Sequence, residues 1–254
     1  MKHLSSLLIL IIFLIPGMLS NSAQARQQEN MEFIRVILEF DIKEGHSKKF
    51  EDHLMAWKEC YLSNGGQTEW SVFYRMNGEG DNYVFTYVKP NWAAFDVKDE
   101  AAAECFNLAE LMVSPDVKST RTHMTKFMPA VSKATPAEDV SVIWATFFRV
   151  KPSGYAHFLE NINTITNHIA EVEGSKRGYW YQYQGGGEGY PHFFVTQAFG
   201  DFTSLDEING VWKNLEEGLG KKKKDELYQE FFEPVASIYS HIYRRLDEHS
   251  HEND

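Results

Sequence analysis

Hydrophobic and polar residues alternate along several stretches of the chain, and this alternation predicts β-strands. Between residues 33 and 42 every even position is apolar, whereas the odd positions include Arg35, Ile37, Glu39 and Asp41. A period of two residues indicates a strand, because successive side chains point to opposite faces. This strand is therefore expected to bury one face fully and to present a mixed face on the other side.

The same reasoning predicts the order strand, helix, strand, strand, helix, strand in each half of the chain. In the first half we expect strands at 33–42, 70–76, 83–89 and 117–127, and helices at 50–61 and within 90–112. In the second half we expect strands at 140–150, 179–184, 192–198 and 237–245, with helices at 155–172, after Thr203 and, as an added piece, at 219–235. Turn residues with Gly separate the paired strands of each hairpin.

The two halves also repeat each other in sequence. Residues 40–50 are echoed by residues 148–158, and Gly78-Glu79-Gly80 is echoed by Gly187-Glu188-Gly189. An internal repeat with a slowly drifting register indicates one structural unit used twice. We assign the first unit to residues 32–130, a linker to 131–139, the second unit to 140–245 and a polar tail to 246–254, in which His249 and His251 are expected to be solvated.

The predicted fold class is α+β, with two ferredoxin-like βαββαβ units packed sheet to sheet. Each unit would carry its helices on one face of its sheet, so that two units can cover each other's bare faces and form a barrel. This order of elements and the aromatic-rich strands resemble the dimeric α/β-barrel superfamily, which includes antibiotic-biosynthesis-type monooxygenases that need no cofactor. The resemblance implies a fused version of a pair that is usually a homodimer, and hence a monomer. It carries over no catalytic residue.

The first 25 residues have the features of a secretory signal peptide. A short basic start is followed by an apolar run from Leu7 to Leu14, and Ala23-Gln24-Ala25 supplies small residues for cleavage before Arg26. The run is too short for a membrane span, so we expect an exported, periplasmic or secreted protein without a span after cleavage.

The net charge and the cysteine and histidine content indicate which partners and sites the protein is expected to have. The formal net charge is −11, which disfavours nucleic acid as a partner. The two cysteines, Cys60 and Cys105, either form a disulfide, as an exported protein permits, or act as two small buried apolar residues. The ten histidines are dispersed, so no metal site is predicted.

Candidate chemistry is expected between the two sheets, where a mostly apolar cavity would carry a few polar groups. Strand alternation places eight candidate ligand-binding residues there: Glu39, Arg121, His123, Arg149, Tyr183, His192, Tyr239 and His241. The repeat puts His123 and His241 at equivalent positions, where they would carry protons, hold a metal or haem, or hydrogen-bond within the sheet interface. Glu39 and Arg149 would form a buried ion pair or bind a polar ligand group.

Three functions remain open at this stage. The first is a module that binds a small apolar or aromatic molecule between its sheets and needs no cofactor. The second is an enzyme, either a monooxygenase without a cofactor or a haem-binding variant that would use His123 or His241. The third is an interaction protein whose barrel is filled by its own aromatic side chains. No phosphate-binding loop, zinc-protease helix or serine nucleophile elbow is present in the sequence.

Overall fold

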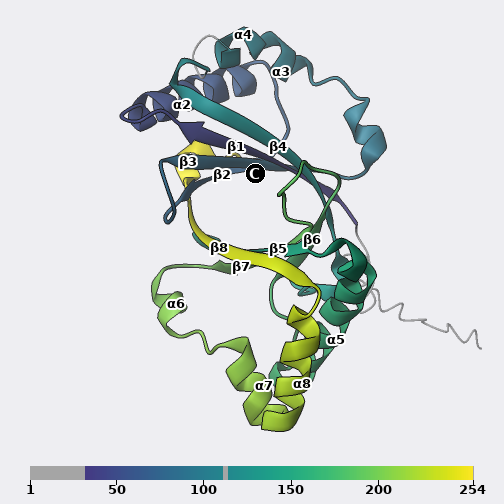
Figure 1. The fold of residues 1–254 in the computed structure, drawn as a ribbon. Coiled ribbons are helices and arrows are strands. Elements are labelled where there is room, and N and C mark those ends of the chain that lie inside the picture. The colour runs from purple at the N-terminus through teal and green to yellow at the C-terminus, as the bar shows by residue number, and fades with distance from the viewer. Residues whose placement is uncertain (1–31, 111–113, 254) are drawn as a thin grey trace, which may run out of the picture.

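Eight antiparallel strands close into a barrel in the computed structural model, which describes residues 32–110 and 114–253 (Figure 1). The predicted signal peptide therefore lies outside the described residues. The strands are β1 (Ile34–Ile42), β2 (Trp70–Arg75), β3 (Asn82–Lys89), β4 (Val117–Phe127), β5 (Val142–Val150), β6 (Tyr179–Tyr183), β7 (Phe193–Phe199) and β8 (Val235–Arg245). Their order around the barrel is β1-β3-β2-β8-β5-β7-β6-β4.

Each half of the chain contributes four neighbouring strands in the same relative order. The first half reads β4-β1-β3-β2 and the second reads β8-β5-β7-β6. The sequence suggested two sheets that face each other, but the sheets also join edge to edge through short β2–β8 and β4–β6 ladders. A barrel without free edges results, in which every strand has two hydrogen-bonded neighbours.

The pairing of the strands is irregular at corresponding places in the two halves. The register of β1 against β4 shifts between Asp41 and Ile42, and that of β5 against β8 shifts between Arg149 and Val150. These two shifts fall within the segments 40–50 and 148–158 that echo each other in the sequence. A β-bulge bends the bulged strand and increases its twist, so both halves turn at the same point.

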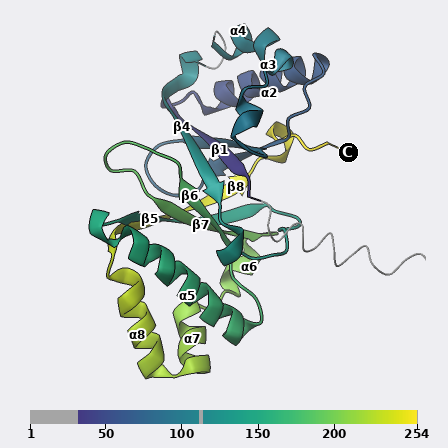
Figure 2. The same ribbon diagram turned by 90° about the vertical axis from the view of Figure 1, so that its right-hand side faces the viewer.

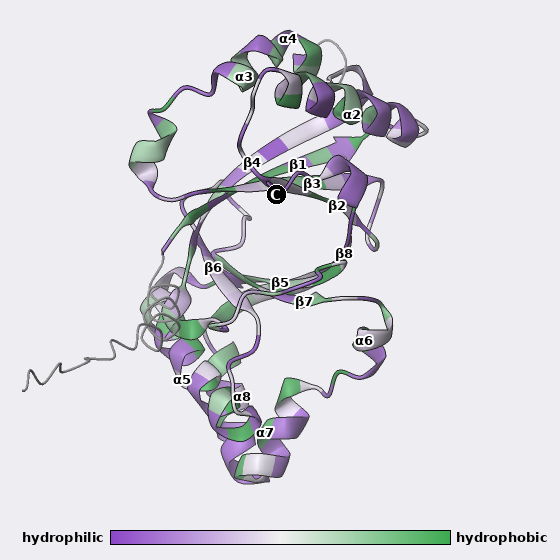
Figure 3. Ribbon diagram, turned by 180° about the vertical axis from the view of Figure 1, so that it is seen from behind, coloured by the Kyte–Doolittle hydropathy of each residue, from purple (hydrophilic) through white to green (hydrophobic). Residues whose placement is uncertain are grey.

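Helices cover the outer face of each half of the barrel, on opposite sides of the molecule (Figures 1 and 2). They are α2 (Ser47–Ser63), α3 (Glu100–Glu104) and α4 (Phe106–Leu108) in the first half, and α5 (Tyr155–Glu173), α6 (Thr203–Asp206), α7 (Val211–Leu219) and α8 (Lys221–Phe232) in the second. Figure 3 shows apolar and polar residues alternating along α2, α5 and α7, as expected for helices that bury one side. One apolar core lies under each helical layer and a third fills part of the barrel.

The structure divides two predicted helical regions into shorter helices. The predicted region 90–112, of which residues 90–110 are described, contains the short helices α3 and α4, and the side chain of Asp99 caps α3 by accepting a hydrogen bond from the Ala102 amide. In the second half α8 occupies the predicted addition at 219–235, and the separate helix α7 precedes it. The two helices meet at Gly220, whose positive φ of 83° suits glycine.

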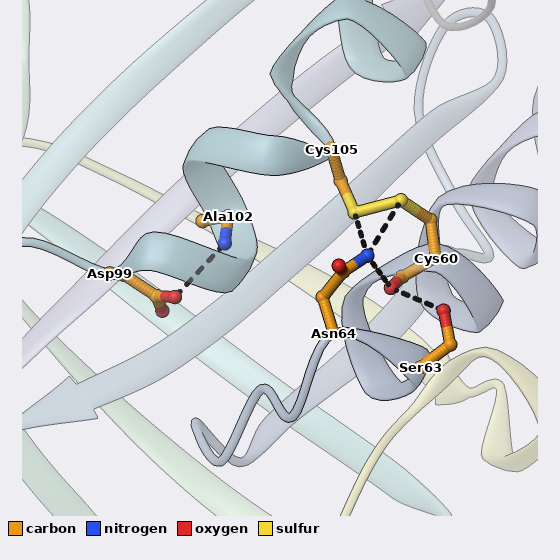
Figure 4. Close-up of a disulfide and its surroundings, with 6 residues drawn as sticks. All are labelled: Cys60, Ser63, Asn64, Asp99, Ala102 and Cys105. Atoms are coloured by element: carbon orange, nitrogen blue, oxygen red, sulfur yellow. Dashed lines mark hydrogen bonds between the residues drawn. A yellow bond between two sulfur atoms is a disulfide. The ribbon is translucent and has the colours of Figure 1, made fainter.

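The two cysteines, whose state the sequence left open, form a disulfide in the structure (Figure 4). Cys60 lies near the end of α2 and Cys105 directly follows α3. The amide of Asn64 donates a hydrogen bond to the Cys60 carbonyl oxygen and lies 3.7 Å from both sulfur atoms. The disulfide therefore links the segment that contains α3 and α4 to α2, the main helix of the first half.

The polar tail is docked on the first half and is not a solvated extension. His251 and Trp70 exchange two backbone hydrogen bonds of 2.9 Å, and the Trp70 indole donates to the His249 carbonyl oxygen. Ser250 is buried and its hydroxyl accepts the Val72 amide. The expectation of solvated tail histidines was wrong because pairing with β2 supplies partners that a local sequence pattern does not show.

In the part of the chain that the structure describes, no helix has both the length and the apolar character needed to cross a bilayer.

Candidate functional site

A cavity of about 850 Å³ occupies one end of the barrel, where β1 and β5 begin and β4 and β8 end. The alternation of the strands decides which side chains reach it. From β1 these are Arg35, Ile37 and Glu39, which are the odd positions that the sequence placed on the mixed face. From the other strands the lining includes Ser71, Phe73, Val84, Thr86, Phe127, Ile143, Ala145, Phe147, Tyr179, Tyr181, Tyr183, Phe194, Thr196, Ala198, Tyr243 and Arg245.

The connection between the two halves forms a wall of this cavity. Residues 132–137, within the predicted linker, line it together with residues 174–176, which follow α5. A more polar hollow of about 620 Å³ shares Lys133, Thr135 and Lys176 with the cavity and continues toward Arg177 and Asn214. The linker therefore separates an apolar interior from a polar outer hollow.

Aromatic rings make up much of the cavity surface. Phe33 and Phe127 stack with their centroids 4.7 Å apart, and Tyr181 stacks on Phe194 at the same distance. Phe147 lies against the other side of Phe194 at 5.6 Å. Rings that are packed against each other form a rigid apolar surface, and such a surface suits an apolar ligand.

Arg35 brings a positive charge into this aromatic interior. Its guanidinium lies over the rings of Phe33 and Tyr181, at 5.7 and 5.5 Å from their centroids. Nη1 donates a hydrogen bond of 3.3 Å to the Thr86 hydroxyl, whereas Nε is buried without a partner. Strand alternation predicted Arg35 on the face toward the cavity, although it is not among the eight candidate ligand-binding residues.

Glu39 connects the cavity to a polar network deeper in the barrel. Its carboxylate lies 3.0 Å from the Arg121 guanidinium and 3.5 Å from His123 Nε2, and Arg121 also reaches Asp41 at 2.9 Å. Burial would raise the pKa of Glu39, but hydrogen bonding to His123 and the charges of His123 and Arg121 hold it below its ordinary value. Glu39 is therefore ionised and already paired.

Arg149 does not take the place that the sequence suggested beside Glu39. Its side chain is exposed, and Glu39 pairs instead with Arg121 and His123 of its own half. The β1–β4 register explains this choice, because Glu39 lies directly opposite Arg121 on the neighbouring strand. A partner on the adjacent strand lies within reach of a short side chain.

His123 is buried in the barrel next to Tyr183, and His241 lies next to a different group of rings. The ring of His123 contacts Tyr183 at 5.4 Å and Tyr190 at 5.3 Å. The ring of His241 lies 5.5 Å from Tyr239 and near Phe147 and Tyr243. Its Nδ1 is buried without a partner, and burial, followed by the nearby Arg75 charge, lowers its pKa. The two histidines that the sequence pattern predicted to be equivalent thus have different surroundings.

Tyr183 and Tyr239 also occupy different environments. Tyr183 is buried and lines the cavity, and its burial raises its pKa well above the ordinary value. Tyr239 is 43% exposed and stacks on Phe147 at 4.9 Å, beyond the cavity lining. Burial and the Glu39 charge raise the pKa of Tyr239 to about 12. Both hydroxyls therefore stay protonated at neutral pH.

His192 lies apart from the cavity and has a structural partner. Its Nδ1 accepts a 2.9 Å hydrogen bond from the Val150 amide, at the bulge of β5, and its ring contacts Tyr155 at the start of α5. Burial, and then the Arg149 charge, lowers the pKa of His192, which favours the neutral acceptor form. The prediction that His192 contributes to a ligand site between the sheets does not fit this position.

Of the eight predicted site residues, Glu39 and Tyr183 line the cavity and His123 contacts both. Arg121, Tyr239 and His241 lie toward the other end of the barrel, and Arg149 and His192 lie outside this group. The residues that the predicted site omitted are Arg35, Thr86 and the linker wall. A strand pattern tells the face of a side chain but not its depth along the barrel axis.

No histidine is among the described residues that line the cavity, so neither His123 nor His241 presents a ring nitrogen to that space as a haem ligand. His123 Nε2 already faces Glu39. Within the described ranges, no group of three or more His, Cys, Asp or Glu side chains could hold a metal ion.

Comparisons with known proteins identify the fold but not a family. No family model matches the chain, and no curated protein matches it in sequence. Among solved structures, a putative monooxygenase of Fusobacterium nucleatum matches with a TM-score of 0.54 and 12% identity, covering 85% of this chain and 94% of that one. An anthrone oxidase-like protein matches with a TM-score of 0.53 and 11% identity, covering 86% and 93%.

A mutant chlorite dismutase from Candidatus Nitrospira defluvii, in complex with cyanide, matches with a TM-score of 0.51 and 6% identity, covering 89% of this chain and 96% of that one. These identities are low, so the likeness concerns the fold alone. It agrees with the expected α/β-barrel architecture.

Proposed function

We propose that this protein binds a small, largely aromatic molecule in the barrel cavity. The observation that carries the proposal is a cavity of about 850 Å³ at one end of the barrel, lined by stacked rings. This volume is within the range of small-molecule sites, about 300–1,000 Å³. The alternative of a barrel filled by its own side chains is less well supported, because the aromatic cluster occupies only part of the interior.

Blocking the cavity tests this proposal directly. Ala198 lines the cavity from β7, whereas its neighbour Gln197 points to the opposite face of the same strand. We expect Ala198→Trp to abolish binding of the neutral fluorescent dye Nile red, and the matched control Gln197→Trp to leave it unchanged. Equal dye binding by the wild type and both variants would show that the dye binds elsewhere.

A second candidate is oxidation of such a ligand by molecular oxygen without a cofactor. The observation in its favour is the fold likeness to a putative monooxygenase and an anthrone oxidase-like protein. Glu39 is the carboxylate that reaches the cavity from the strands, but its lowered pKa and its pairing with Arg121 make it a weak base. Oxygen consumption on addition of anthrone, lost in Glu39→Gln, would favour this candidate. A haem-dependent reaction finds no support in the cavity lining.

We also propose that the protein is exported and that its two halves are equivalent units joined in one chain. The Cys60–Cys105 disulfide supports a location outside the cytoplasm, since such bonds persist in oxidising compartments. The matching strand orders and bulges support two equivalent units in one chain that acts as a monomer. N-terminal sequencing of the exported protein is expected to begin at Arg26, and an intact Met1 would contradict cleavage.

A further inference from the structure

We infer that the ligand of the cavity is an aromatic carboxylic acid whose carboxylate pairs with Arg35. This inference rests on the proposed function, because it specifies the chemistry of a ligand in the same space.

The first step is the incomplete hydrogen bonding of Arg35. A guanidinium carries five N–H donors in a planar fork. Here Nη1 donates to Thr86, and Nε is buried with no partner. A buried N–H group that has lost its water without gaining a partner destabilises the folded protein. An additional hydrogen-bond acceptor would therefore stabilise the guanidinium of Arg35.

The second step is the absence of a counter-charge. Among the described residues, no carboxylate lies within ion-pair distance of Arg35, although two acidic residues line the cavity. Glu39 is paired with Arg121 and His123, and Glu252 is paired with Arg245. The acids near the cavity are thus committed to other cations, and the charge of Arg35 remains to be balanced from outside the chain.

The third step is the geometry around the charge. Arg35 lies against Phe33 and Tyr181, and these rings continue into the stacks with Phe127 and Phe194. A planar ligand that lies along these rings would bring a substituent on its edge to the guanidinium of Arg35, which lines the cavity. A carboxylate is the anion that matches the fork with two parallel hydrogen bonds.

Binding of matched aromatic compounds tests the inference. Wild-type protein is titrated calorimetrically with 2-naphthoate and with the neutral 2-naphthamide, which has nearly the same shape. We expect 2-naphthoate to bind about tenfold more tightly or better, because a hydrogen-bonded charge pair in a buried site contributes that much. Equal affinity for the two compounds would overturn the inference.

Variants of Arg35 then assign the preference to this side chain. Arg35→Met is expected to lose the preference for 2-naphthoate while its affinity for 2-naphthamide changes less than about twofold. The control Arg149→Met removes an exposed arginine and is expected to keep the preference. Folding should survive in Arg35→Met, since the apolar side chain can keep the packing against Phe33 and Tyr181 and the lost charge has no ion-pair partner. A melting temperature close to that of the wild type checks this. A preference retained in Arg35→Met would also overturn the inference.

The outcomes separate this inference from the proposed function. Failure of the wild type to bind Nile red or either naphthalene compound would contradict the proposed function itself. Binding of Nile red and of both naphthalene compounds, without a preference for the acid, would leave the proposed function standing and refute only the role of Arg35.

Discussion

Asp116 joins α2 to the start of β4 through a buried carboxylate. His46 and His53 each place Nδ1 at 2.7 Å from one of its oxygens, and its side chain is 3% exposed. The hydrogen bond from His46 lowers the pKa of Asp116 most, burial opposes this effect, and His53 adds to it. The carboxylate is therefore ionised in the folded protein, where it holds two elements together.

Asp116→Asn should destabilise the protein at pH 7 by about 2 kcal/mol, as expected for a buried, charge-assisted hydrogen-bond pair. Because the folded pKa lies below the ordinary value of 3.8, the stabilisation by Asp116 is complete above that pH and is lost as the pH falls below it. Urea unfolding at pH 7 and pH 3 should show the difference between wild type and variant shrinking at acid pH. Asp96→Asn, at an exposed position, is the control. If wild type and Asp116→Asn still differed as much in unfolding free energy at pH 3, the ionised carboxylate would not be the source of the stabilisation.

At the residue scale the sequence predicts the face of each side chain better than its partner. Alternation placed Arg35 and Glu39 toward the interior, and they are there. It also suggested that Glu39 forms an ion pair with Arg149 or binds a ligand with it, and that His192 contacts a ligand. The partners are instead decided by register and by the bulge of β5, where the Val150 amide needs an acceptor. Register across strands is a property of the folded barrel, and a single-strand pattern does not contain it.

At the scale of elements, the Cys60–Cys105 disulfide fixes a segment that is too short to be stable alone. The helices α3 and α4 span five and three residues, and helices of this length need tertiary support. The bond closes a loop with a sequence separation of 45 residues. The chain-entropy model gives such a loop about 4 kcal/mol, and measured values are often smaller.

The double variant Cys60→Ser, Cys105→Ser should therefore unfold with about 2–4 kcal/mol less stability than the oxidised protein. Hydrogen exchange should show the largest loss of protection in residues 99–108, because this segment loses its tie to α2. Reduction of the wild type provides an independent control that should reproduce both effects. Unchanged exchange in that segment would mean that packing alone holds it.

The strands were predicted within a few residues, whereas the short helices and the tail were not. A strand with apolar residues at every second position, such as β1, carries its own signal in the sequence. Between residues 90 and 110 the chain forms a turn at Trp92–Phe95 and the short helices α3 and α4, and Asp99 caps α3. The tail is ordered by the two backbone hydrogen bonds between His251 and Trp70, residues far apart in the chain. Contacts of this kind depend on the closed barrel and leave no local pattern.

At the scale of the whole molecule, neither half encloses the interior alone. The cluster inside the barrel combines Ile37 and Phe73 of the first half with Phe147 and Phe194 of the second. The seams between the halves are short, with three residue pairs each in β2–β8 and β4–β6, and Asn77 extends the first by bonding its side chain to the Ile242 amide. Separation of the halves would expose the edges of four strands, β2, β4, β6 and β8, together with an aromatic face.

The full-length chain is therefore expected to unfold in one cooperative transition and to sediment as a monomer. A fragment of residues 32–130 should not give a folded monomer, because β2 and β4 would have free edges and the inner face of the sheet would be open to water. The fragment is instead expected to pair with a second copy of itself, so that each copy supplies the half of the barrel that the other lacks. Calorimetry and sedimentation of both proteins check this. A soluble monomeric fragment with its own melting transition would show that each half is an independent domain, and the barrel would then be an assembly of two stable parts rather than a single folding unit.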